Sequence, residues 1–478
     1  MSPPTVPPAP DAIERFLDLV LDTRYEQLPA AAVAAAKVFF LDTVGVACAG
    51  RLAPRLPGLL TAARSWGGGD AATVNLWNTG ERTTAPVAAL VNGYQCHALE
   101  YDCVYEPGVI LPAAPIFAAL MAQSERLAAV GQAPTGRDLL RAFTVAVEVS
   151  CTLGLACRSG MFFFRPGTTG VFSALAAIAC LSPLPRDALR YAFGIGYSQM
   201  SGSMQAHEEG SMMLAMQMGF AARNAVMAYD MAQAGITGPV EVLEGRFGFF
   251  HNYEHGHALP EALAQIGAPW KVTQLSHKPF PSGRVTHGAI HTLRMLQAEL
   301  GLARVDAAQV VQSISFGLPP LGVRLVGRPM IHNPPSNYAR LCVPFVAATE
   351  LLHGAVDPSS FTPERLASPA IEALARRIEV IEVPRPDENA FYPQHLRLTL
   401  SGGRVIEREI PYAWGHPLFP LTAAEREHKF RRCFDLTRGE GAGHAAATDA
   451  MLAWIDRLEE APGCQPLIAL LGEPVSLP

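Results

Sequence analysis

Apolar residues recur with helical spacing through the first half of the chain. Between residues 11 and 262, segments rich in Ala, Leu and Val follow one another, separated by Gly and Pro. Apolar positions three and four apart form one stripe on a helix, so this pattern predicts a large helical domain. Two examples are residues 30–40, which run into LDTVGVACAG, and residues 218–234, which end before Gly235 as a helix commonly does.

The pattern changes at about Trp270, where short segments with β-branched residues begin. The segments that favour strands are 310–316, 378–383, 396–400 and, after the turn-forming SGG at 401–403, RVIEREI. We therefore expect a mainly α protein with two domains: a helical domain over 11–269 and a smaller α+β domain over 270–412. Helical patterning returns after residue 412, and we expect residues 413–478 to pack back on the helical domain.

Composition narrows the class of protein. Hydrophobic residues make up 49% of the 478 residues and charged residues only 17%. This balance requires much buried surface, in a large core or between subunits, so we expect an oligomer. The net charge is −6, and the absence of a Lys/Arg-rich run argues against nucleic acid as a partner.

Neither the uncharged stretch at 166–185 nor the N-terminus favours a membrane location. The apolar part of that stretch, 172–181, is too short for a span and predicts a buried core helix instead. The first ten residues, MSPPTVPPAP, lack the features of a secretory signal and predict a flexible tail. Nine cysteines without a C-x-x-C pair fit reduced, buried thiols, so we expect a cytoplasmic protein without a membrane partner.

Six segments, in order, resemble the MmgE/PrpD family and span nearly the whole chain. They are LDTVGVACAG at 41–50, NGYQCHALEYD at 92–102 with EPGVILPAAP at 106–115, GFAARNAV at 219–226, ITGPVEVLEGRFGFF at 236–250, KPFPSGRVTH at 278–287, and WGHPLFPLT at 414–422 with Lys429 and Phe430 beyond it. The resemblance implies a helical domain interrupted by an α+β lid domain, and a homodimer. It also implies an enzyme that eliminates water, loses carbon dioxide or inverts a stereocentre.

These three reactions all move a proton at a carbon next to a carboxylate. Such a carbon is a weak acid, so the site needs a positioned general acid or base, and cations or N–H groups that stabilise the developing charge. This chemistry requires neither metal nor nucleotide, and the sequence has neither a glycine-rich phosphate loop nor an H-E-x-x-H motif. We therefore expect no cofactor and a small carboxylate as the substrate.

The segment KPFPSGRVTH holds the first group of candidate residues. By resemblance, Lys278 and His287 match positions that the family uses at its active site. Arg284 is expected to hold a substrate carboxylate with two hydrogen bonds, Ser282 to cap the following helix or bind an oxyanion, and His287 to shuttle a proton. The alternative is a surface loop whose polar groups only cap that helix.

The segment HALEYD holds the second group. His97 and Tyr101 are four residues apart and share a face if the segment is helical, with Asp102 beside them. We take Tyr101 and Asp102 as candidate catalytic residues and His97 as a candidate for substrate binding. The alternative for His97 is a core histidine whose hydrogen bonds are satisfied within the protein.

At several positions this chain departs from the family pattern. The family commonly has D-F-D-D where this chain has Glu100 to Cys103, and a histidine where Glu106 stands. It also has a histidine before the RPGTTGVFSA segment, where this chain has Phe164 and Arg165, and we take Arg165 as a candidate for substrate binding. A lysine and a histidine of the family correspond here to Leu214 and Gln217. These departures indicate a changed substrate.

Three further groups of residues are weaker candidates. His207 and Glu209 lie in QAHEEGSMM. This segment has two interpretations: a catalytic histidine with a neighbouring glutamate, or a helix end exposed to solvent. Tyr338 lies in PPSNYAR, at a position where the lid domain of the family contributes to the active site. The histidines of HNYEHGH have spacing that zinc can use, but the ligand set is incomplete, so we expect no metal.

The leading hypothesis is a cofactor-independent lyase that acts on a small carboxylate in the cleft between the two domains. An isomerase or epimerase of the same fold is the first alternative, because it needs only proton removal and return. The second is a non-catalytic paralogue that keeps the fold and the dimer. A metal-dependent hydrolase is a distant third.

Overall fold

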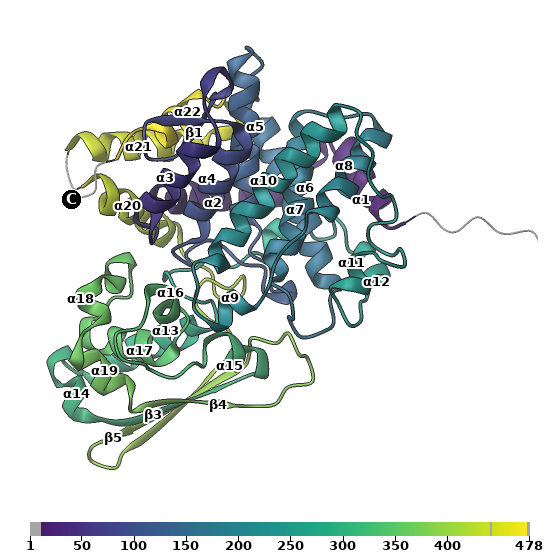
Figure 1. The fold of residues 1–478 in the computed structure, drawn as a ribbon. Helices are drawn as coiled ribbons and strands as arrows, with labels where there is room; N and C mark the ends of the chain where they lie inside the picture. The colour runs from purple at the N-terminus through teal and green to yellow at the C-terminus, as the bar shows by residue number, and fades with distance from the viewer. Residues whose placement is uncertain (1–10, 440–441, 476–478) are drawn as a thin grey trace, which may run out of the picture.

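A computed structural model of the chain describes residues 11–439 and 442–475 (Figure 1). It has a large helical domain and a smaller domain that contains helices and one sheet, as predicted from the change of pattern near residue 270. The predicted N-terminal tail, residues 1–10, and the last residues of the predicted C-terminal segment, 476–478, lie outside the described residues.

Long helices build the first domain. They are α1 Ile13–Asp22, α2 Ala30–Ala49, α3 Leu56–Trp66, α4 Ala85–His97, α5 Ala113–Ala129, α6 Gly136–Ala156, α7 Arg165–Leu181, α8 Arg186–Ser198 and α10 Met213–Gln233. The shorter elements are α9 Gln205–Glu208, α11 Phe249–Asn252, α12 Leu259–Leu263, and a hairpin of β1 Val74–Leu76 with β2 Glu81–Thr83. Helix α10 ends one residue before Ala234, and Gly235 follows with a left-handed φ of 88°, the conformation that favours glycine after a helix.

The predicted core helix at 172–181 is part of α7. Every residue of α7 except the last, Leu181, is buried, and α5, α6 and α10 surround it. A helix that is apolar on all sides must be enclosed by other helices, which explains its central position. All nine cysteines of the chain are buried and free, as expected for reduced thiols.

Two other helical stretches, Ala30–Leu52 and Gly136–Ala156, have the length and mean hydropathy of a membrane span. Inside the protein, 61% and 89% of these stretches is buried. Their apolar surface is therefore largely used in packing against neighbouring helices, which makes them weak evidence for a membrane location.

The second domain packs helices against a four-stranded sheet. Its helices are α13 Thr286–Leu300, α14 Ala307–Val310, α15 Pro320–Val326, α16 Ser336–Arg340, α17 Val343–His353, α18 Pro363–Leu366 and α19 Pro369–Ala375. The strands are β3 Val311–Leu318, β4 Ile378–Glu382, β5 Gln394–Leu400 and β6 Val405–Ile410, in the order β4-β3-β5-β6. Strands β3 and β4 are parallel, which the intervening helices allow, and the other pairs are antiparallel. All four strands coincide with segments whose composition predicted them.

The last part of the described chain lies against the helical domain (Figure 1). Helices α20 Ala423–Arg438 and α21 Ala442–Asp456 contact α2, and α22 Gln465–Gly472 contacts β1 and α5. The connecting 3₁₀ turns are η1 Tyr25–Gln27, η2 Gly50–Leu52, η3 Gly69–Ala71, η4 Glu106–Gly108, η5 Lys271–Gln274, η6 Arg304–Asp306, η7 Pro358–Phe361 and η8 Leu458–Glu460. The helical domain is thus built from residues that precede the second domain in the sequence and from residues that follow it.

Helices α4 and α10 approach closely because each has a glycine at their contact. A Cβ atom on Gly93 would lie 2.8 Å from the Cα atom of Gly219, and one on Gly219 would lie 2.1 Å from the carbonyl oxygen of Leu90. Both clashes are with backbone, so side-chain rotation cannot relieve them. These two helices carry His97 and Leu214, and their spacing therefore sets the geometry of the site described below.

We expect Gly219→Ala to destabilise the protein, because the added methyl group must push α4 and α10 apart. Overpacking of this kind costs about 1–3 kcal/mol. The control is Gly58→Ala on α3, where the added Cβ would meet nothing within 4 Å and alanine favours the helix. Urea denaturation should show a lower midpoint for Gly219→Ala and an equal or higher one for Gly58→Ala. Equal midpoints for Gly219→Ala and the wild type would contradict this account of the helix crossing.

Candidate active site

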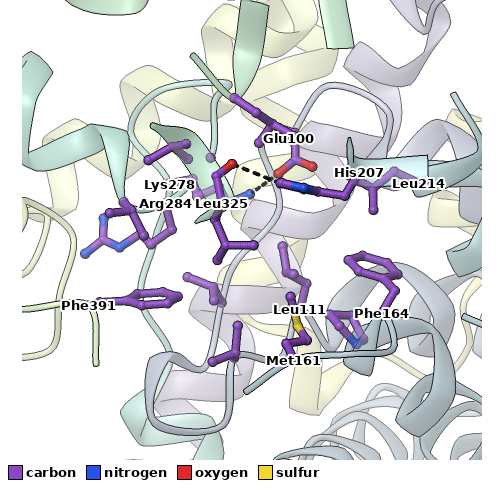
Figure 2. A pocket seen from close by; sticks show the side chains of 17 residues that line it. Glu100, Leu111, Met161, Phe164, His207, Leu214, Lys278, Arg284, Leu325 and Phe391 are labelled. Carbon is purple, nitrogen blue, oxygen red and sulfur yellow. Dashed lines mark hydrogen bonds and ion pairs between the residues drawn. The ribbon is translucent and has the colours of Figure 1, made fainter. Parts of the chain in front are cut away.

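A cavity lies between the two domains and is lined by residues of both (Figure 2). The helical domain contributes Glu100, His207 and Leu214, and the second domain contributes Lys278, Leu325 and Phe391. The cavity encloses about 530 Å³ of empty space, part of it open to solvent. A concave, largely apolar space with a few convergent polar groups is the usual form of a small-molecule site.

Four ionisable side chains form a chain of contacts that ends at the wall of the cavity. Lys278 Nζ donates a hydrogen bond of 2.8 Å to Glu100 Oε2, and Glu100 Oε1 lies 3.3 Å from His97 Nε2. His97 Nδ1 lies 2.9 Å from Asp102 Oδ1. Acidic and basic groups alternate along this Asp102–His97–Glu100–Lys278 chain, so each buried group has an opposite neighbour.

The backbone after α4 places Glu100 over the end of that helix. Helix α4 ends at His97, and Glu100 has a left-handed φ of 52°, which is uncommon for a residue other than glycine. Its N–H donates a hydrogen bond of 2.8 Å to the carbonyl oxygen of His97. Strained backbone of this kind persists where the surrounding contacts fix it. Here the contacts are the two cationic partners of the Glu100 carboxylate.

Burial and the alternating charges shift two pKa values in opposite directions. Burial by itself disfavours the charged form of His97, but the carboxylates of Asp102 and Glu100 raise its pKa to about 10. Burial likewise opposes ionisation of Glu100, but the charges of Lys278 and His97 hold its pKa well below the usual range. His97 is therefore protonated and Glu100 ionised at neutral pH, so His97 is part of an ionic network rather than a neutral core histidine.

His207 lies at the same end of the cavity as Glu100 and Lys278, and its pKa is lowered where that of His97 is raised. Its Nε2 atom lies 2.9 Å from the carbonyl oxygen of Leu325 (Figure 2). Arg328 donates a hydrogen bond of 2.9 Å to the backbone carbonyl of His207. Burial and the nearby charge of Arg328 lower the pKa of His207 to about 4. The imidazole is neutral at pH 7, and the contact with Leu325 assigns the proton to Nε2. Nδ1 then carries a lone pair, which lies 3.4 Å from Nη2 of Arg328.

The prediction that His97 and Tyr101 share a face holds only if the segment is helical, and this condition is not met because α4 ends at His97. The left-handed turn at Glu100 directs Tyr101 away from the cavity, into a second hollow lined by residues such as Arg432 and Trp414. There the Tyr101 hydroxyl lies 3.4 Å from the carbonyl oxygen of Pro279, and Lys429 Nζ lies 4.2 Å from the ring centre. Asp102 is fully buried behind His97, so neither Tyr101 nor Asp102 lines the cavity.

The other candidates of the KPFPSGRVTH segment lie in the interior rather than in a surface loop. Arg284 differs from the expected carboxylate clamp, since four of its five N–H groups already bind protein oxygens. They are Glu106 Oε1 at 2.6 Å and the carbonyl oxygens of His277, Trp414 and Ala413 at 2.7–3.1 Å. Its guanidinium group points away from the cavity in Figure 2. Arg284 therefore connects chain segments instead of presenting a free fork.

Ser282 and His287 are also buried and do not line the cavity. The Ser282 hydroxyl lies 2.7 Å from that of Thr286, and α13 has Val285 at its N-cap, so the prediction that Ser282 caps this helix is wrong. His287 Nε2 lies 3.2 Å from the carbonyl oxygen of Ser282, and burial lowers the pKa of His287 well below its usual value. Both residues hold the shape of the segment that carries Lys278.

Three more predicted residues lie outside the cavity lining. Arg165 is buried at the start of α7, where it pairs with Glu254 at 3.2 Å and binds nearby carbonyl groups. Glu209 is exposed and accepts a hydrogen bond of 2.6 Å from Gln205, as expected at a solvated helix end. Tyr338 donates a hydrogen bond of 2.7 Å to the carbonyl oxygen of Pro329. None of the three is positioned to touch a molecule in the cavity.

The histidines of HNYEHGH point to different neighbours. His251 Nδ1 lies 2.9 Å from the carbonyl oxygen of Gly245, whereas His255 packs on Phe162 and His257 packs on Phe250. Among residues 11–439 and 442–475, no group of three His, Cys, Asp or Glu side chains is arranged to hold a metal ion.

The structure adds Glu100, which the sequence interpretation treated only as a departure from the family pattern. It also places Leu214, which stands where the family has a lysine, in the cavity wall. Phe164, which with Arg165 stands where the family has a histidine before the RPGTTGVFSA segment, lies in the wall too. Glu106 takes no place in the wall and pairs with Arg284 instead. The signal that could have found Glu100 is its position between His97 and Asp102, because a cluster of ionisable residues within a mostly buried segment requires partners of opposite charge.

Comparisons with known proteins agree with the fold. Residues 14–262 match the MmgE/PrpD N-terminal domain, and residues 280–451 match the MmgE/PrpD C-terminal domain. The chain belongs to the MmgE/PrpD family. The two family domains meet at the segment that begins with Lys278, so this MmgE/PrpD protein has its cavity at the domain boundary.

The named relatives of this MmgE/PrpD protein include an enzyme. The chain is 24% identical to cis-aconitate decarboxylase of Aspergillus terreus over 471 residues, which cover 95% of this chain and 94% of the relative. It is 27% identical to the cis-aconitate decarboxylase-like protein oryM of Aspergillus oryzae over 371 residues, 72% of this chain and 74% of the relative. At the level of the family, these matches support an enzyme of the dehydratase or decarboxylase type.

The raised pKa of His97 makes stability depend on pH in a defined direction. An unfolded histidine has a pKa near 6.5, whereas that of folded His97 is about 10. The stabilisation is fully present below the unfolded value and is lost as pH rises through the folded value. We therefore expect the difference in unfolding free energy between wild type and His97→Gln to be largest near pH 6 and to shrink toward pH 10. Denaturation at several pH values measures it, and a difference that stays constant would contradict the charged state of His97.

Proposed function

We propose that this protein is a lyase of the dehydratase or decarboxylase type that moves a proton next to the carboxylate of a small organic acid. The observation that carries the proposal is Lys278. Its ammonium group is buried at the cavity wall and, among the described residues, donates one hydrogen bond, to Glu100. An ammonium group has three donors, so two are available to a carboxylate in the cavity.

In this proposal the substrate carboxylate binds to Lys278, and its neighbouring carbon lies near His207. When the C–H bond breaks, His207 Nδ1 takes the proton and the electron pair moves toward the carboxylate, where the ammonium group stabilises it. The pair then expels a hydroxide from the next carbon as water, with the proton supplied by His207. In decarboxylation the C–C bond breaks instead and carbon dioxide leaves, and the carbanion receives a proton that His207 has first taken up from solvent. Removal of water from the buried site strengthens each of these interactions.

Glu100, His97 and Asp102 have a positioning role in this mechanism. Glu100 holds the Lys278 ammonium group at 2.8 Å, and His97 and Asp102 balance the Glu100 charge behind it. The network is complete without a metal ion or an organic cofactor in this proposal, because an ammonium group supplies the positive charge. Lys278 and His207 are the groups we expect to touch the substrate.

An isomerase or epimerase remains the second candidate, and one observation favours it. Leu214 and Phe164 line the cavity where the family pattern has a lysine and a histidine, so two potential proton donors for a leaving group are missing. Proton removal and return require no leaving group. Deuterium incorporation without net consumption of a chiral substrate, together with loss of its optical purity, would establish this alternative over the lyase.

We also propose that the protein acts as a cytoplasmic homodimer. Met213, Phe220 and Met227 are seven residues apart on α10 and so lie on one face, with Met213 44% and Met227 37% exposed. A second copy of the chain would cover this apolar face. Analytical ultracentrifugation should give twice the monomer mass, and Met213→Glu combined with Met227→Glu should give the monomer mass.

For the lyase itself we expect Lys278→Met to reduce exchange of solvent deuterium into the substrate by about 10²–10⁴-fold, since the charge that stabilises the carbanion is lost. NMR with a panel of small carboxylic acids in deuterated water measures this exchange. The matched control is Lys37→Met, which removes a lysine of α2 that pairs with Glu459 and lies outside the cavity. Equal exchange by wild type and Lys278→Met would remove Lys278 from the reaction. No exchange by the wild type across the panel would favour a non-catalytic paralogue.

A further inference from the structure

The two ends of the cavity differ in chemistry. Glu100, Lys278 and His207 lie together at one end, and Leu111, Met161 and Phe391 lie at the other (Figure 2). Leu325 and Leu214 are close to the polar end and are apolar themselves. A molecule that fills this space therefore meets charged and hydrogen-bonding groups with one part and only hydrocarbon and sulfur with the other.

Among the described residues that line the cavity, Lys278 is the cation with hydrogen-bond donors left for an anion. Of the two cationic side chains in its lining, Arg284 is committed to Glu106 and three carbonyl groups, which leaves Lys278. His207 is close to Lys278 and is held by Leu325. A second carboxylate on the substrate would lie against the apolar end, where it would lose its hydration without gaining a partner.

We propose that the substrate is an acid with a single carboxylate and a small hydrocarbon portion, and that the cavity rejects acids with two or three carboxylates. This inference rests on the proposed function for the reacting end and on the apolar lining for the rest of the substrate. The carboxylate binds Lys278, and the hydrocarbon portion lies among Leu111, Met161 and Phe391. Burial of that portion in the apolar end contributes to binding through the hydrophobic effect.

Leu214 is the residue that we expect to determine this preference. It lies on α10 beside the polar end, so a lysine there would place a second ammonium group at the wall of the cavity. Leu214→Lys should therefore admit a second carboxylate. Leu214→Met keeps the position apolar with a similar volume and is the matched control.

Matched acids test the inference by calorimetry on the full-length protein. The monocarboxylates butanoate, hexanoate and 2-hexenoate are compared with the dicarboxylates succinate, adipate and 2-hexenedioate, which have the same chain lengths. We expect wild type and Leu214→Met to bind the monocarboxylates at least about tenfold more tightly. Leu214→Lys should reduce this ratio or reverse it.

Each outcome is decisive. Preference of the wild type for the dicarboxylates, equal binding of both series, or no binding of either series at millimolar concentration would overturn the inference. Deuterium exchange into the bound acids separates the inference from the proposed function. If monocarboxylates bind but no acid exchanges deuterium, the inferred substrate class stands and the proposed lyase is refuted. If only dicarboxylates exchange deuterium, the inferred substrate class is refuted and the proposed lyase stands.

Discussion

The Asp102–His97–Glu100–Lys278 chain is the interaction on which the site depends. Buried ions are stable only when each has an opposite partner, and here the partners come from both domains. Lys278 begins the segment that enters the second domain, and the other three residues follow α4 in the helical domain. The ionic chain therefore fixes the position of one domain relative to the other, and the same contact brings the one available ammonium group to the wall of the cavity.

Close helix packing supports that arrangement. The approach of α4 to α10 through Gly93 and Gly219 brings the end of α4, with His97, near the start of α10, with Leu214. Arg284 and Glu106 form a second buried ion pair between the domains, at 2.6 Å. Because these groups are committed to protein partners, the charge that remains for a ligand is small. Of the charged groups that line the cavity, Glu100 and Arg284 are therefore occupied by protein partners, and Lys278 keeps donors for a ligand.

The family motifs identified two segments that line the cavity but not the contacts of individual residues. KPFPSGRVTH and HALEYD do meet at the cavity, and Lys278 lines it as expected by resemblance. Arg284, Ser282 and His287 are buried in the same segment with protein partners. A sequence motif shows which residue types occur together, but the direction of each side chain depends on neighbours that are distant in sequence, such as Ala413 and Trp414 for Arg284.

The sequence by itself determined the two-domain architecture, the buried helix α7 and the strands of the sheet, because periodicity and β-branched composition act locally. It also located the segments of the site. Only the tertiary structure decided that α4 ends at His97, that Glu100 turns back toward Lys278, and that Tyr101 faces away. The physical reason is that a left-handed residue and a chain of buried charges are stable only through partners from elsewhere in the fold. The local sequence does not show which distant residues those partners are.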